Sequence, residues 1–195
     1  MTRRAGRLLR AAGPPLAALL LTVCGCGPGD DQRKARTEPR TAQGPLIHLY
    51  FPGPDDRLHA EARRLPGGLN TPVERLHALG QLWLEGPQSD RLGRPLPQLE
   101  SLRLDLSPAG RVYADLVPRP ESEPPRLGST EEAGALYSLV NTLVLNVPEA
   151  REVVVLWNGV QPATLAGHLD TGAPLTPRLD LLAADATPPA PPSGR

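Results

Sequence analysis

The sequence predicts an α+β domain with a mixed or antiparallel sheet and two helices packed on one face of that sheet. Two segments, residues 71–85 and 129–147, place apolar residues at helical spacing. Residues 46–65, 99–117 and 152–165 instead carry pairs of short strand-like runs separated by turn residues. The two kinds of segment alternate along the chain, which gives the expected element order ββαββαββ.

The first pair of strands is expected at residues 46–51 and 58–65. Residues 46–51, LIHLYF, form a short apolar run that Pro52 ends, as in a strand buried on both faces. Residues 58–65, LHAEARRL, alternate apolar and polar side chains, as in a strand with one solvent-facing side. Turn-forming residues at 53–56 join the two.

The first helix is expected to begin after Thr71 and to end at Gly86. Thr71 suits the N-cap, Pro72 suits the first helical position, and Glu74 completes a capping box. The apolar stripe that would face the sheet consists of Val73, Leu76, Leu79, Leu82 and Trp83.

A hairpin and a second helix follow. Residues 99–106 and 112–116 alternate with a period of two around a Ser-Pro-Ala-Gly turn at 107–110. Residues 129–132, Ser-Thr-Glu-Glu, match a second capping box, and Pro148 ends the helix. The apolar face of this helix is expected to consist of Ala133, Leu136, Tyr137, Val140, Leu143, Val144 and Val147.

The last pair of strands is expected around a two-residue turn. Residues 152–157, EVVVLW, are strongly strand-like, and Asn158-Gly159 is typical of a tight hairpin turn. The return segment, which ends near Leu165, contains Pro162 and therefore suits a sheet edge.

The N-terminal residues 1–25 are typical of a lipoprotein signal peptide. Basic residues precede an uncharged run at 11–23, which is shorter than the ~20 residues that span a bilayer. Cys26 follows Gly25 in a pattern that resembles a bacterial lipobox, so we expect Cys26 to carry the lipid, palmitate included. The alternatives are an ordinary cleaved signal, a metal site at Cys24 and Cys26, which has no histidine nearby, and a disulfide between them, which would close a strained small loop.

The remaining chain divides into three parts by composition. Residues 26–44 are expected to form a disordered tether, residues 45–180 a single domain, and residues 181–195 a disordered Pro-rich tail. Removal of residues 1–25 takes away four arginines and no acid, which leaves 17 basic against 21 acidic residues and a net charge of −4. A mildly acidic chain disfavours nucleic-acid binding, because phosphates need a basic surface.

No recognisable catalytic motif is present in the sequence. It lacks the nucleophile elbow, the zinc-protease helix motif and the phosphate-binding loop. His59-Ala60-Glu61 matches only the first half of a zinc-deaminase signature. Asp105 and Asp115 could meet across their hairpin, but such carboxylates are usually solvated. The other histidines, His48, His77 and His168, have no metal-ligand spacing. We therefore expect no enzyme activity, no cofactor and no metal.

Several motifs, taken in order, resemble the GerMN domain, which is named from spore-germination proteins and occurs in bacterial envelope lipoproteins. They are LYFP at 49–52, LGQLWLEGP at 79–87, VYADL at 112–116, LVNTL at 139–143 and VVVLWNG at 153–159. Asn158 stands where the family usually has aspartate, and the chain holds one copy of a domain that some members carry twice.

The resemblance implies a non-enzymatic protein of the sporulation and germination type. We expect it to be exported and lipid-anchored to the cell envelope, at the outer membrane or the periplasmic face of the inner membrane in a Gram-negative host. It would act as a protein-interaction or assembly module, with an envelope protein or a second copy as partner and no small-molecule substrate. The alternatives are a small-ligand or glycan-binding domain with a pocket around Trp83 or Trp157, and a hydrolase with an unrecognised site.

Docking is expected at a sheet edge or an adjoining helix face. An exposed edge offers unpaired N–H and C=O groups to another strand. Because Pro162 would blunt the last strand, the edges at 46–51 and 58–65 are the preferred candidates, together with the helix surface at 128–145.

Overall fold

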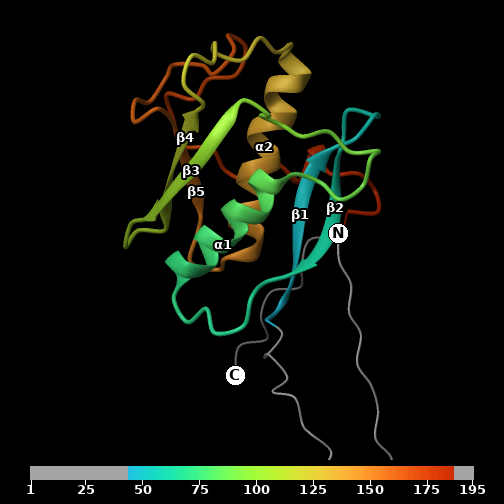
Figure 1. The fold of residues 1–195 in the computed structure, drawn as a ribbon, viewed down its shortest axis with the longest axis vertical. Helices are drawn as coiled ribbons and strands as arrows, with labels where there is room; N and C mark the ends of the chain where they lie inside the picture. The colour runs from blue at the N-terminus through green and yellow to red at the C-terminus, as the bar shows by residue number, and fades with distance from the viewer. Residues whose placement is uncertain (1–43, 187–195) are drawn as a thin grey trace, which may run out of the picture. The chain divides into compact units, whose positions relative to one another are not determined.

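A helix lies between two small sheets in the computed structural model, which describes residues 44–186 (Figure 1). The helix is α2 (Ser129–Asn146), and a second helix, α1 (Pro72–Glu85), packs beside it. The first sheet is the antiparallel hairpin of β1 (Leu46–Pro52) and β2 (Leu58–Arg64). The second sheet has the order β3-β4-β5 and consists of β3 (Leu99–Leu106), β4 (Arg111–Pro118) and β5 (Glu152–Trp157).

The α+β class is confirmed, and the structure refines the arrangement. The strands form two sheets where one was expected. Both helices pack on one face of the three-stranded sheet, as expected, and α2 also contacts β1 of the hairpin on its other side. The order of helices and strands is ββαββαβ followed by a short 3₁₀ helix, η1 (Leu179–Leu181). The expected eighth element, the return strand after Asn158-Gly159, is reduced to an isolated bridge between Trp157 and Val160.

The described fold continues past residue 180. Leu182 forms a parallel bridge with Leu58, the N–H of Ala183 donates to the Leu58 carbonyl at 2.9 Å, and Ala183 and Ala186 are buried. The expected signal peptide at 1–25, the lipid site Cys26, all but the last residue of the tether at 26–44, and the tail from 187 lie outside the described residues.

Helix α1 follows the sequence prediction closely. The Thr71 hydroxyl accepts the Glu74 N–H at 3.2 Å, and the Glu74 carboxylate accepts the Thr71 N–H at 2.9 Å. That backbone hydrogen bond lowers the pKa of Glu74. Gly80 lets the helix approach β3, because a Cβ at this position would lie 2.7 Å from a methyl carbon of Leu104.

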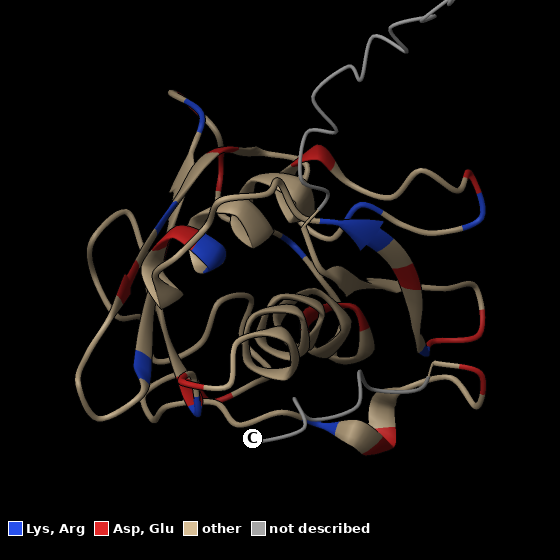
Figure 2. Cartoon of the chain, turned by 90° about the horizontal axis from the view of Figure 1, so that it is seen from below, with Lys and Arg blue, Asp and Glu red and all other residues tan. Residues whose placement is uncertain are grey.

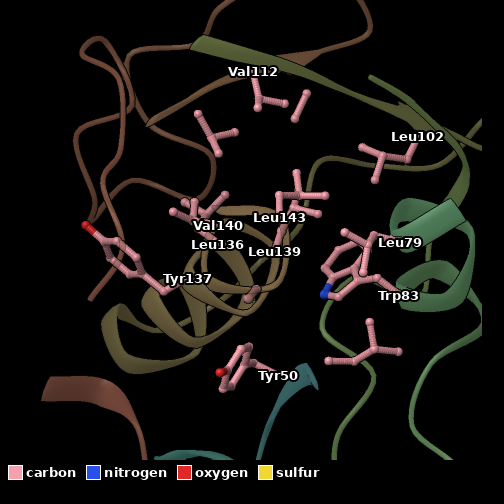
Figure 3. Close-up of a cluster of buried hydrophobic side chains, with 14 of the residues drawn as sticks. Tyr50, Leu79, Trp83, Leu102, Val112, Leu136, Tyr137, Leu139, Val140 and Leu143 are labelled. Atoms are coloured by element: carbon pink, nitrogen blue, oxygen red, sulfur yellow. The ribbon is translucent and has the colours of Figure 1, made fainter. Parts of the chain in front are cut away.

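The middle of helix α2 is buried on all sides, because it is flanked by α1 and by both sheets. Every residue from Ala135 to Leu143 is buried. Figure 3 shows Leu136, Leu139, Val140 and Leu143 among side chains of α1 and the second sheet, with Tyr50 on the opposite side. The predicted apolar face is thus confirmed, and the polar residues between its members are buried as well.

Those polar residues fasten β1 to α2. The Ser138 hydroxyl donates to the Tyr50 carbonyl at 2.7 Å, and the Thr142 hydroxyl accepts the Tyr50 N–H at 3.0 Å. The Asn146 amide accepts the His48 N–H at 3.0 Å and donates to the His48 carbonyl at 2.7 Å. Ser138, Thr142 and Asn146 are four residues apart, so they lie in one row along the helix. This row takes the place of a neighbouring strand.

Ser138 also connects α1 to this row. The indole N–H of Trp83, which is 2 % exposed, donates to the Ser138 hydroxyl at 2.6 Å. One hydroxyl therefore joins α1, α2 and β1 inside the core.

We predict that Ser138→Ala destabilises the fold by about 1–3 kcal/mol, because it leaves the Trp83 N–H and the Tyr50 carbonyl buried without a partner. Chemical denaturation measures the loss. Ser129→Ala, at an exposed serine of the same helix, is the control and should stay within about 0.5 kcal/mol of the parent. Equal stability of the Ser138 variant and the control would show that this junction is not needed.

Candidate functional site: the outer edges of the two sheets

The outer edge of β1 is closed. Its outward N–H and C=O groups at His48 and Tyr50 are bonded to Ser138, Thr142 and Asn146 of α2. The expectation that residues 46–51 offer a docking edge is therefore wrong. The run was correctly expected to be a buried strand, but its covering neighbour is a helix that lies more than eighty residues away in sequence.

The outer edge of β2 is open over its second half. In an antiparallel pair, successive residues point their backbone groups alternately toward the partner strand and away from it. The N–H of Leu65 donates to Pro45 next to β1, so Ala60, Ala62 and Arg64 direct their backbone groups outward. Within residues 44–186, only Leu58 at the start of this edge is occupied, by Ala183.

A groove of about 560 Å³ lies beside the first half of β2 and reaches the open edge at Ala60. Its lining includes His59, Ala60, Ser89, Arg91 and Asp185. His59 lies between two carboxylates, with Nε2 at 2.9 Å from Asp55 and Nδ1 at 3.8 Å from Asp185. The hydrogen bond with His59 lowers the pKa of Asp55.

The outer edge of β3 is the second open edge. Leu102, Leu104 and Leu106 direct their backbone groups outward, because Arg103 and Asp105 pair with β4. Two side chains contact this edge: Nε2 of His77 lies 2.7 Å from the Leu104 carbonyl, and Asp105 accepts the Leu106 N–H at 2.8 Å. His77 and Asp105 are both exposed to solvent.

The edge of β5 is largely covered, although not by Pro162. Val153 and Leu175 exchange two hydrogen bonds of 2.8 Å, and Trp157 pairs with Val160. The open edges of the described residues are therefore those of β2 and β3.

The residues considered for catalysis are not brought together. Asp115 accepts the Gly159 N–H at 2.7 Å and lies 3.6 Å from Arg103, whereas Asp105 bonds its neighbouring backbone. The histidines at 48, 59, 77 and 168 lie on separate elements. No group of three or more histidine, cysteine or acidic side chains within residues 44–186 is arranged to hold a metal ion.

The two tryptophans considered for a glycan site lie apart, on α1 and β5. Trp83 is buried with its N–H occupied by Ser138, and Trp157 is half-buried against the core. Neither tryptophan lines the groove beside β2, and neither lines a cleft of about 290 Å³ between the end of β1 and the start of α2.

Charged residues are dispersed over the described part of the chain. Figure 2 shows arginines and acidic residues scattered over the loops, strands and helices. No helix among residues 44–186 has the length and apolar character needed to cross a membrane.

Glu132 makes the contact that the sequence did not reveal. Its carboxylate is fully buried and accepts four backbone N–H groups. The donors are Leu165 at 3.0 Å, Ala166 at 2.7 Å, His168 at 2.8 Å and Leu169 at 3.1 Å.

The sequence analysis placed Glu132 in a capping box that begins at Ser129, and this assignment is wrong by one residue. The N-cap is Gly128, whose N–H donates to Glu131 at 2.8 Å. Glu132 is thereby free to hold the 165–169 segment against α2. Two consecutive glutamates in a first turn were the available signal, because only one of them can close the box.

Comparison with known proteins identifies the family. The model of the Germane family, described as sporulation and spore germination, matches residues 48–163, which is more than half of the 195-residue chain. The chain belongs to the Germane family. The resemblance to GerMN domains is thereby confirmed, and the match spans α1, α2 and all five strands except the first two residues of β1.

Solved structures resemble this Germane domain at low sequence identity. A protein from Clostridium perfringens, described as a candidate lipoprotein, is 19 % identical with a TM-score of 0.45, and the match covers 68 % of this chain and 87 % of that one. The first GerMN domain of the Bacillus subtilis sporulation protein GerM is 18 % identical, with a TM-score of 0.47 and coverages of 72 % and 98 %. The tandem GerMN domains of the same protein are 19 % identical, with a TM-score of 0.46 and coverages of 71 % and 46 %. No curated protein gave a significant match.

We predict that Glu132→Gln destabilises the Germane domain by about 2 kcal/mol or more. An amide has one acceptor oxygen where the carboxylate has two, so buried N–H groups of 165–169 lose their partner. Denaturation of Glu131→Gln provides the matched control, because Glu131 is an exposed neighbour with a single backbone bond. If the Glu132→Gln protein is as stable as the Glu131→Gln control, this role of Glu132 is contradicted.

Proposed function

We propose that this member of the Germane family is a non-catalytic interaction module, anchored to the bacterial cell envelope by a lipid on Cys26. The observation that carries the proposal is the open outer edge of β2 from Ala60 to Arg64, while α2 closes the equivalent edge of β1. Family membership supplies the link to sporulation and germination.

An open edge of this kind supports recognition of an extended peptide segment. The outward N–H and C=O groups supply the affinity of strand addition, and pockets beside the strand supply its specificity. The groove at Ala60, where the open edge begins, offers such a surface, with Arg91 for acidic groups and Asp185 for basic groups. The partner we propose is an extended segment of another envelope protein.

The lipid anchor is supported by the N-terminal sequence. The basic start, the short apolar run and Gly25 before Cys26 match the requirements for export and lipid attachment. An anchored domain meets partners on the same membrane at a raised effective concentration. A strand-addition interface of low affinity would therefore be enough for binding.

Attachment can be tested with Cys26→Ser. We expect this variant to be recovered as soluble or unprocessed protein, whereas the parent fractionates with detergent-extractable membranes. Cys24→Ser should behave as the parent, since lipid attachment is assigned to Cys26. A processed Cys26→Ser protein that remains in the membrane would contradict the anchor.

Strand addition can be tested with Ala62→Pro. Proline removes the outward N–H of this residue without loss of a bond to β1, and edge strands tolerate it. A photo-reactive residue at the exposed Arg64 should give crosslinks to envelope proteins in cells, and Ala62→Pro should abolish them. Ala62→Val, which keeps the N–H and suits a strand, is the control. A folded Ala62→Pro protein with unchanged crosslinks would exclude the β2 edge.

A further inference from the structure

We propose that β3 is a self-association edge, at which two copies of this chain pair antiparallel about a two-fold axis through Leu104. The open edge of β3 belongs to the three-stranded sheet, so pairing would join two such sheets into one of six strands. The second copy is the indicated partner because the charges of this strand complement themselves in one register.

The backbone register follows from which residues point outward. With the axis at Leu104, Leu104 faces its own copy, and Leu102 of each chain faces Leu106 of the other. Each of these outward-facing pairs exchanges two hydrogen bonds in an antiparallel ladder. The side chains of Leu102 and Leu104 stay in the core of their own copy, where they are 7 % and 6 % exposed.

The side chains on the outer face fix this register. Arg103 of each copy lies opposite Asp105 of the other, at positions without backbone bonds, where facing side chains come closest. An axis at Arg103 would place two arginines opposite each other, and an axis at Asp105 would place two aspartates opposite each other. Like charges in these positions are destabilising. Only the axis at Leu104 converts both charges into opposite-charge pairs.

The contacts already present at this edge are compatible with pairing. Asp105 now accepts the Leu106 N–H, and a strand carbonyl can replace it, which frees the carboxylate for the facing arginine. The Leu104 carbonyl can accept a second donor beside His77, because it has two lone pairs. Arg103 is 71 % exposed with Asp115 at 3.6 Å, so pairing would place it between two carboxylates.

Two charge variants and their mixture test the register. Copies of the full chain with two different tags are co-expressed, extracted from the envelope in mild detergent and assayed for co-purification. Parent copies should co-purify, and Arg103→Asp copies or Asp105→Arg copies alone should lose at least about tenfold of that signal, because like charges then face each other. Arg103→Asp mixed with Asp105→Arg should recover it, since every facing pair is again opposite in charge. Cysteines at 103 in one copy and 105 in the other should form a disulfide.

Three results would overturn the proposal: parent copies that do not co-purify, single variants that associate as the parent does, or a mixture that fails to recover. Glu100→Arg is the matched control, because this exposed carboxylate of β3 lies beyond the paired segment and its charge reversal should change nothing. Thermal unfolding of each variant separates lost pairing from lost folding, and recovery in the mixture requires both variants to be folded. Ala62→Pro should leave the signal unchanged, so this proposal and the β2 hypothesis can fail independently.

Discussion

The fold depends on hydrogen bonds from polar side chains of α2 to backbone groups that no strand pairs, at the outer edge of β1 and in the loops. Ser138, Thr142 and Asn146 serve β1, and Glu132 serves residues 165–169. Asn141 accepts the N–H of Arg178 at 2.9 Å and donates to its carbonyl at 3.1 Å. Each bond contributes only about 1 kcal/mol net, but a buried backbone group left without a partner costs about 1–3 kcal/mol. These side chains are therefore needed to pair the backbone groups wherever α2, and not a strand, lies beside a segment.

This arrangement explains how a chain with few aromatic residues can join two small sheets. A two-stranded hairpin is marginal by itself, and it needs packing against another element. Helix α2 supplies apolar contacts to the second sheet with Leu136, Val140 and Leu143, and strand-like bonds to the hairpin with its polar row. The hairpin is consequently held at its β1 edge, which leaves the β2 edge facing outward. The docking hypothesis for β2 is thus a consequence of how α2 is placed.

Local features were predictable from the sequence and long-range ones were not. The capping box of Thr71 and Glu74 and the turn at Asn158-Gly159, where both residues have positive φ, depend on neighbouring residues only. The division into two sheets depends on contacts between segments far apart in sequence, and periodicity carries no information about them. The parallel pairing of β4 with β5 is of the same kind. The bonds of Ser138 and Thr142 to β1 could not be predicted, because polar residues between apolar ones in a helix usually face solvent.

The candidate site was likewise predictable in its local features and not in its long-range contacts. Alternation in LHAEARRL correctly indicated a strand, and its edge could be proposed for docking because Pro162 disfavoured the last strand. The closure of β1 could not be foreseen, since LIHLYF looks the same whether a strand or a helix covers its edge. The Arg103 and Asp105 pattern of β3 was visible in the sequence, but its meaning required the structure, which shows that this strand lies at an edge.

Native-state hydrogen exchange measures the central claim most directly, because it reports each backbone N–H separately. The amides of His48, Tyr50, Leu165, Ala166, His168 and Leu169 donate to side chains of α2. If α2 replaces a strand as described, these amides should exchange as slowly as the ladder amides between β1 and β2. Exchange of the same amides at the rate of the exposed 119–127 loop would contradict the account.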